Sequence, residues 1–130
     1  ILCYAHYDVQ PPEPIDAWSH GGPWSGSIVD GVLYGRGATD NKSGVLAFTK
    51  AAKAFLQVRG EVPANLKFLI EGEEEIGSPN LAAWAEQNKD LLAAAFTVLG
   101  ACQRAAGGQD EDAPISFLTV ELSSTKLIKN

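Results

Sequence analysis

The chain has 130 residues, 45% of them hydrophobic, which fits one globular domain with a core of ordinary size. Its formal net charge of −6 argues against nucleic acid and anionic membranes as partners, because both need clustered Lys and Arg side chains. No stretch approaches the roughly 18 apolar residues of a membrane span and no signal peptide is visible, so a cytoplasmic location is expected.

The first predicted element is a strand over residues 1–5, ILCYA, and we expect further chain to precede it because it begins in mid-strand. A Pro- and Gly-rich stretch over 11–24 is predicted to be an ordered loop. Residues 27–35 place Asp30 and Gly31 between two short β-prone runs, a pattern that predicts a hairpin.

The middle of the chain predicts a helix followed by a strand. Apolar side chains recur at spacings of three and four from Ser43 to Arg59, which is typical of an amphipathic helix, and Gly60 ends it. Residues 65–71 are nearly all apolar, as expected for a strand that helices cover on both faces.

The last part of the chain continues the alternation of helices and strands. Ser78 as the N-cap and Pro79 as the first helical residue predict a helix that runs to about Lys89. Strands are predicted at 94–100 and at 115–122, with a polar loop between them. The whole pattern predicts an α/β fold with a mostly parallel sheet and helices on both faces.

Titratable side chains follow several of the predicted strands. In α/β sheets, functional groups collect at the carboxyl ends of the strands. One imidazole and several carboxylates brought to one edge are stabilised by a cation among them, so the sequence predicts a divalent metal site. The candidate residues are His6, Asp8, Asp40, Glu74 and Glu75.

Each of these residues also has an ordinary structural interpretation. If the first strand continued through them, His6 and Asp8 would point to one face, so that Asp8 could hold one ring nitrogen while the other binds a metal. A lone His is otherwise often simply hydrogen-bonded or exposed. Asp40 fits the N-cap of the helix that begins near Ser43, which is compatible with a ligand role. The acidic run at 71–75 is also typical of a solvated face.

Three stretches together carry a family resemblance. AHYDVQP, LYGRGATDNK and EGEEEIGS, in this order, resemble the signature stretches of the M20 family of metallopeptidases, closest to its dipeptidase branch, with its carnosine dipeptidases and succinyl-diaminopimelate desuccinylases. The resemblance covers about residues 1–92 and is lost after about 100. It implies a catalytic α/β domain with a site for two Zn²⁺ ions, or for Mn²⁺ or Co²⁺, at its edge.

The resemblance also implies a role for each candidate residue. His6 is expected to bind one metal, Asp8 to orient His6, and Asp40 to bridge two ions beside a cis peptide bond to Asn41. Glu75 is expected to be a metal ligand. Glu74 is expected to be the general base of a metal-activated water that hydrolyses a dipeptide or related acyl-amide bond.

The chain departs from the family pattern toward its C-terminus. A further acidic ligand is expected around 99–103, where LGACQ offers none, and the nearest carboxylates lie at 110–112. A late His ligand and the inserted lid domain, through which family members often form homodimers, are also absent. We therefore expect residues 1–130 to be a partial catalytic domain, seen as a fragment, a truncated product or a frame change. The substrate that the resemblance implies is a small peptide or an acyl-amino acid. The alternative is an inactive metal-binding homologue, or a truncated product, with no turnover.

Overall fold

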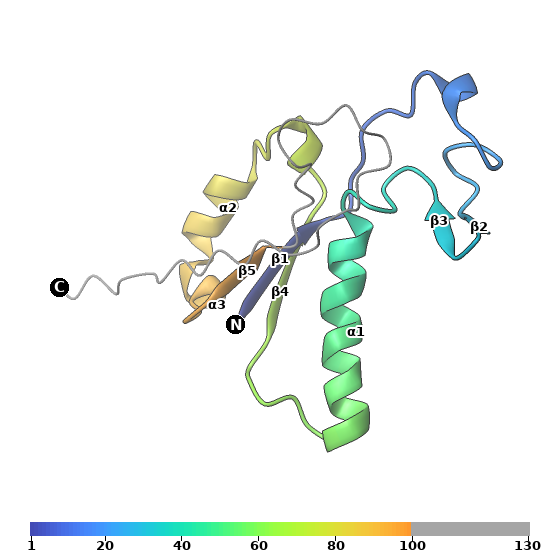
Figure 1. Cartoon of the computed structure of the whole chain (residues 1–130). Coiled ribbons are helices and arrows are strands. Elements are labelled where there is room, and N and C mark those ends of the chain that lie inside the picture. The colour runs from blue at the N-terminus through green and yellow to red at the C-terminus, as the bar shows by residue number, and fades with distance from the viewer. Residues whose placement is uncertain (100–130) are drawn as a thin grey trace, which may run out of the picture.

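The computed structural model describes residues 1–99, and they form a parallel three-stranded sheet. The strand order is β4-β1-β5, with β1 (Leu2–His6) between β4 (Lys67–Glu71) and β5 (Thr97–Leu99) (Figure 1). The register pairs Leu2 with Lys67 and His6 with Glu71, so β1 and β4 end side by side. This common end is the edge at which the sequence predicts a metal site.

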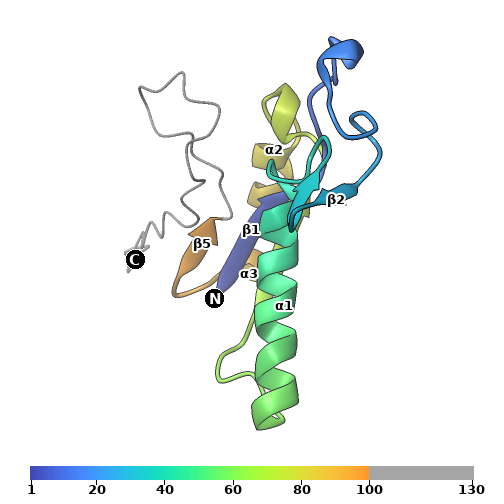
Figure 2. The same cartoon turned by 45° about the vertical axis from the view of Figure 1, so that its right-hand side comes forward.

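Helices lie on both sides of this sheet. The long helix α1 (Lys42–Arg59) lies on one side, and α2 (Leu81–Gln87) and α3 (Lys89–Leu92) lie on the other (Figures 1 and 2). This arrangement confirms the predicted α/β fold. Among the described residues, no helix is both long and apolar enough to cross a membrane.

The ends of α1 lie close to their predicted positions. The helix begins at Lys42, one residue before the predicted start, and it ends before Gly60. Gly60 has a φ of 78°, and its N–H donates to the carbonyl oxygen of Leu56 at 3.0 Å. A glycine takes this left-handed conformation without steric cost, which explains why the helix ends there.

A separate hairpin precedes α1, as predicted. Its strands are β2 (Ser27–Val29) and β3 (Val32–Tyr34), and they pair antiparallel. Asp30 and Gly31 both have positive φ, at 50° and 82°, which is the backbone that a tight two-residue turn requires. The hairpin follows the Pro-rich loop, which contains the short 3-10 helix η1 (Ile15–Ala17).

The predicted start of the second helix is wrong. Asn80, not Ser78, is the N-cap residue of α2, which begins at Leu81. Ser78 has a positive φ of 51°, and its hydroxyl donates to Glu71 Oε1 at 3.0 Å. Because its side chain is committed to the end of β4, Ser78 is not available to cap a helix.

The centre of the described core is β1. Leu2, Cys3 and Ala5 are buried, whereas Phe68 and Ile70 in β4 remain 42% and 38% exposed. The prediction that helices cover both faces of β4 is therefore wrong for the described residues. The physical reason is position, because β4 is an edge strand of the described sheet and α1 contacts the central strand β1. The predicted strand at 94–100 is β5, and the one at 115–122 lies outside the described residues.

Candidate metal centre

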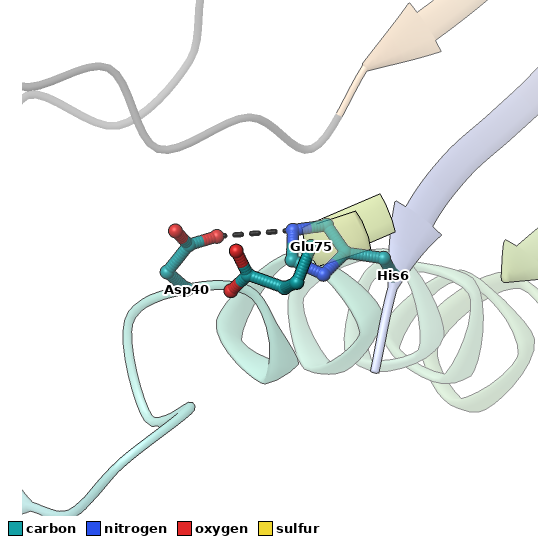
Figure 3. Close-up of side chains that lie close together, drawn as sticks. All are labelled: His6, Asp40 and Glu75. Atoms are coloured by element: carbon teal, nitrogen blue, oxygen red, sulfur yellow. Dashed lines mark hydrogen bonds and ion pairs between the residues drawn. The ribbon is translucent and has the colours of Figure 1, made fainter. Parts of the chain in front are cut away.

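Three predicted ligands meet at the carboxyl end of the sheet. His6 is the last residue of β1, Asp40 precedes α1, and Glu75 lies in the 3-10 turn η2 (Glu74–Ile76) that follows β4. One nitrogen or oxygen atom from each of the three lies within 4.8 Å of the others (Figure 3). The fold therefore brings together side chains from three distant segments, as the sequence predicted.

The two ring nitrogens of His6 face different partners. Nε2 lies 3.0 Å from Asp40 Oδ1 and 3.6 Å from Glu74 Oε2, whereas Nδ1 lies 3.3 Å from Asp8 Oδ1. Asp8 Oδ1 is buried and accepts no hydrogen bond of ordinary geometry. The hydrogen-bond partner of Nδ1 is the backbone carbonyl oxygen of Asp8, at 3.3 Å. A proton on Nδ1 suits both oxygens of Asp8, and it leaves the lone pair of Nε2 for a cation, because a neutral imidazole carries one donor and one acceptor.

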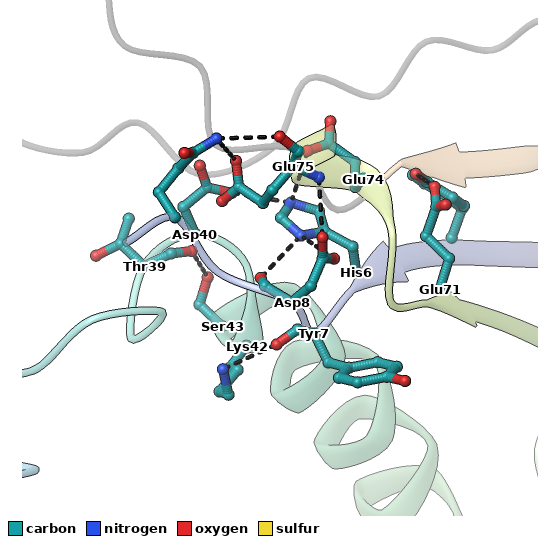
Figure 4. A network of polar contacts seen from close by, with 12 residues as sticks. His6, Tyr7, Asp8, Thr39, Asp40, Lys42, Ser43, Glu71, Glu74 and Glu75 are labelled. Atoms are coloured by element: carbon teal, nitrogen blue, oxygen red, sulfur yellow. Dashed lines mark hydrogen bonds and ion pairs between the residues drawn. The ribbon is translucent and has the colours of Figure 1, made fainter. Parts of the chain in front are cut away.

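Asp8 reaches His6 by a different route from the one predicted. The strand ends at His6, so the two residues do not share one strand face; instead the loop that follows β1 brings Asp8 back to the ring. Asp8 Oδ2 also accepts a hydrogen bond from the backbone N–H of Glu75 at 2.9 Å (Figure 4). Asp8 therefore connects the imidazole to the turn that carries two of the glutamates.

The electrostatics of Asp8 favour its charged form. Burial raises the pKa of its carboxyl group, but backbone hydrogen bonds from η2 and the nearby His6 outweigh burial, so the net pKa is lowered. The carboxylate is therefore ionised at neutral pH, as its contacts with both His6 and η2 require.

The loop before α1 presents Asp40. The peptide bond between Asp40 and Asn41 is cis, which confirms the expectation drawn from the family resemblance. The interpretation of Asp40 as the helix N-cap is wrong, because Asn41 occupies that position without a side-chain capping bond. The carboxylate of Asp40 faces His6 instead of the first helical turn, and its side chain is 56% exposed.

Contacts behind the candidate ligands fix this loop. Ser43 Oγ donates to the carbonyl oxygen of Thr39 at 2.5 Å, and Lys42 Nζ donates to the carbonyl oxygen of Tyr7 at 2.9 Å (Figure 4). The second contact joins the start of α1 to the segment that follows β1. The backbone around Asp40 and the backbone after His6 are thus held to each other.

Glu74 and Glu75 lie in the tight turn η2 and not in an extended segment. Successive side chains of a 3-10 turn are about 120° apart, so neighbours take different directions from one short piece of backbone. Glu74 Oε2 lies near His6, and Glu75 belongs to the cluster of three candidate ligands. The two glutamates thus approach the same imidazole from different places, which allows them different tasks.

The donor set fits a divalent transition metal. One imidazole nitrogen and two carboxylate oxygens are ligand types that zinc uses, and manganese and cobalt accept them as well. The orientation of His6 by Asp8 is the arrangement that metal-binding histidines commonly show. The positions around 99–103, where the family resemblance calls for an acidic ligand that LGACQ does not offer, lie largely outside the described residues, as do the carboxylates at 110–112.

Comparison with known sequences points to peptidases. The sequence profile of peptidase family M20/M25/M40 matches residues 2–120. The chain is 49% identical over 90 residues to the Beta-Ala-His dipeptidase of Homo sapiens, and the match covers 69% of this chain but 18% of that protein. It is 42% identical over 92 residues to the succinyl-diaminopimelate desuccinylase of Methylorubrum extorquens, a match that covers 66% of this chain and 24% of that protein. The chain thus spans about a fifth of the length of these relatives.

Solved structures give the same result. The chain superposes on an M20 family metallo-carboxypeptidase from Sulfolobus solfataricus with a TM-score of 0.71 and 43% identity, over 76% of this chain and 22% of that one. It superposes on human carnosine dipeptidase 1 with a TM-score of 0.68 and 44% identity, over 75% of this chain and 21% of that one.

Proposed function

Because the chain belongs to peptidase family M20/M25/M40, we propose that it contributes to the metal-dependent hydrolysis of a dipeptide or a related acyl-amide bond. The observation that carries this proposal is the convergence of His6, Asp40 and Glu75 on one point at the edge of the sheet. The substrate class follows from the relatives, which include a dipeptidase and a desuccinylase. A homodimeric state and a cytoplasmic location stay predictions from the sequence.

We assign the metal to His6 Nε2 and to the carboxylates of Asp40 and Glu75. The ion, Zn²⁺ by family resemblance or else Mn²⁺ or Co²⁺, polarises the scissile carbonyl and lowers the pKa of water when it is bound. Asp40 has two carboxylate oxygens and an exposed side chain, so it can contact a second ion. The backbone carbonyl oxygen and the carboxylate Oδ1 of Asp8 each lie 3.3 Å from His6 Nδ1, so Asp8 favours a proton on Nδ1 and leaves Nε2 for the metal.

We assign the general-base role to Glu74. Its Oε2 lies 3.6 Å from His6 Nε2, so the carboxylate lies beside the ligands but outside the group of three. In this position Glu74 can take a proton from the attacking water and deliver it to the amine as the C–N bond breaks. The reaction leaves one carboxylate and one protonated amine, which together hold both protons of the water, and Glu74 returns to its ionised form.

The alternative is a metal-binding homologue without turnover. The number of candidate ligands favours this alternative. Residues 1–99 contain one cluster of three candidate ligands, whereas a site for two ions needs more than three protein ligands. Three protein ligands are still enough for a catalytic site with one ion and an open position. The two functions therefore differ in turnover and not in the ability to bind metal.

The test combines metal content and activity. Zinc would be measured after dialysis of the chain, and dipeptide hydrolysis would be assayed with and without a chelator, on the chain and on any longer product of the same gene. Bound zinc with chelator-sensitive hydrolysis supports the proposal. Bound zinc without hydrolysis in every form of the protein would favour the inactive homologue, and absence of bound metal would contradict both.

A further inference from the structure

The loop after β1 makes three hydrogen bonds to a single residue of η2. Asp8 Oδ2 accepts from the backbone N–H of Glu75 at 2.9 Å. Gln10 Nε2 donates to the carbonyl oxygen of Glu75 at 3.2 Å and to its side-chain Oε2 at 2.8 Å. The backbone donor, the backbone acceptor and the carboxylate of Glu75 are therefore all held by two residues that lie at least 65 positions earlier in the chain.

The bond from Gln10 to the carboxylate has a particular chemical character. A Glu side chain has several rotatable bonds, and a bond to one oxygen restricts them before any cation arrives. The amide donor is neutral, so it fixes the carboxylate without cancelling the charge that attracts a metal, as a Lys or Arg partner would. A carboxylate has about four acceptor positions, so one bond from Gln10 leaves capacity for an ion.

We propose that Gln10 is a positioning residue that holds Glu75 ready to bind the metal. The inference rests on the proposed function, because it takes Glu75 to be a ligand. Gln10 acts through Glu75 and belongs to the partners behind a ligand, whose removal typically weakens metal binding about 10- to 100-fold.

The test is a titration of the metal-free chain with Co²⁺ alone, followed by the visible absorption of the bound ion. We expect Gln10→Ala to raise the Kd for Co²⁺ about tenfold and to change the absorption spectrum at saturation, because Glu75 is no longer fixed. The matched control is Gln57→Ala, which removes another exposed glutamine, on α1 away from the site. This control should leave both the Kd and the spectrum unchanged.

A second variant separates positioning from a general effect on the fold. In a Glu75→Ala background, Gln10→Ala should not weaken Co²⁺ binding further, because the side chain through which it acts is gone. The thermal unfolding midpoint of metal-free Gln10→Ala should match that of Gln57→Ala. A similar loss of affinity in both backgrounds, or a lowered midpoint that accounts for the loss, would overturn the proposal.

The outcomes also separate this inference from the proposed function. If the unsubstituted chain binds Co²⁺ and Gln10→Ala binds it equally well, the role of Gln10 is refuted and the metal centre stands. If the unsubstituted chain binds no Co²⁺, both are refuted. If Gln10→Ala weakens binding as expected but no form of the protein hydrolyses a dipeptide, the role of Gln10 is supported and only the proposed turnover is refuted.

Discussion

Tyr4 in β1 donates its hydroxyl hydrogen to the carboxylate of Glu71, the last residue of β4, although 67 positions separate the two in the chain. The same oxygen, Glu71 Oε1, accepts from the hydroxyl of Ser78 at 3.0 Å. Glu71 therefore links the central strand of the sheet to the segment just beyond η2. These two bonds give Glu71, a member of the acidic run at 71–75, a structural role that the sequence alone does not reveal.

Glu73 has a similar structural task. Its carboxylate accepts from Asn80 Nδ2 at 2.9 and 3.0 Å, and its carbonyl oxygen accepts from the N–H of Ser78 at 2.8 Å. Glu71 lies apart from Glu74 and Glu75 (Figure 4). The run is thus divided between residues that hold the turn and residues that face His6.

The first prediction concerns the ionisation of Tyr4. Burial, the hydrogen bond to Glu71 and the negative charges of Glu71, Glu74 and Asp8 all raise its pKa well above the ordinary tyrosine range. When tyrosinate absorbance is followed as pH rises, the unsubstituted chain should show one tyrosine that ionises only above the ordinary tyrosine range. This part of the absorbance change should be lost in Tyr4→Phe. Tyr7→Phe, which removes another of the three tyrosines, should retain it.

This shift also sets the sign of a stability effect. Above a pH of about 10 the unfolded chain loses the Tyr4 proton while the folded chain keeps it, so the free energy of unfolding falls as pH rises. The contribution is fully present below that pH. Urea unfolding at two alkaline pH values should show a smaller decline for Tyr4→Phe than for the unsubstituted chain, and an equal decline would contradict the assignment.

The second prediction tests Glu71 as a structural residue. Glu71→Ala leaves the hydroxyls of Tyr4 and Ser78 without their acceptor and should lower the free energy of unfolding by about 1–3 kcal/mol. Glu71→Gln keeps an oxygen that can accept from both hydroxyls, so its loss should be smaller. Urea unfolding of the metal-free chain measures both, and equal losses would show that the negative charge matters and not the acceptor.

The third prediction separates the two glutamates of η2 in an active form of the protein. Glu74→Gln should lower turnover about 10²- to 10⁴-fold with zinc content nearly unchanged, because an amide cannot take the proton from water. Glu75→Gln should lower zinc content itself. Turnover and zinc per chain after dialysis would be compared, and the reverse pattern would exchange the roles of the two residues.

The fourth prediction concerns Asp8, which contacts both His6 and η2. Asp8→Ala should weaken zinc binding about 10- to 100-fold, because it removes the negative charge beside His6 Nδ1 and the acceptor for the Glu75 N–H, although the backbone carbonyl that pairs with Nδ1 remains. Asp16→Ala, in the short helix η1, is a control that removes one acidic residue elsewhere. Equal zinc affinities for the two variants would show that only net charge matters.

The fifth prediction tests the end of α1, remote from the candidate metal centre. Gly60→Ala places a Cβ at a φ of 78° and should lower the free energy of unfolding by about 1–2 kcal/mol. Gly60→Asn should cost less, since Asn tolerates this conformation. Chemical denaturation measures both, and Ala tolerated as well as Asn would contradict the left-handed cap.

Much of the fold could be predicted because its signals are local. The periodicity of α1, the glycine that ends it and the Asp30-Gly31 turn each lie within a few residues of the structure that they specify. The start of α2 could not be predicted in the same way. Ser78 is a good N-cap by local chemistry, but a distant carboxylate, Glu71, takes its hydroxyl.

For the candidate site, the sequence by itself determined which residues are candidates for the chemistry. His6, Asp40 and Glu75 were named from the order of three motifs, and the structure brings them within reach of one another. Only the tertiary structure decided what holds them there. The bonds from Tyr4 to Glu71 and from Gln10 to Glu75 join residues 65 or more positions apart. They depend on the parallel pairing of β1 with β4, which brings the segments after both strands to one edge, and no local pattern in a single sequence specifies such a pairing.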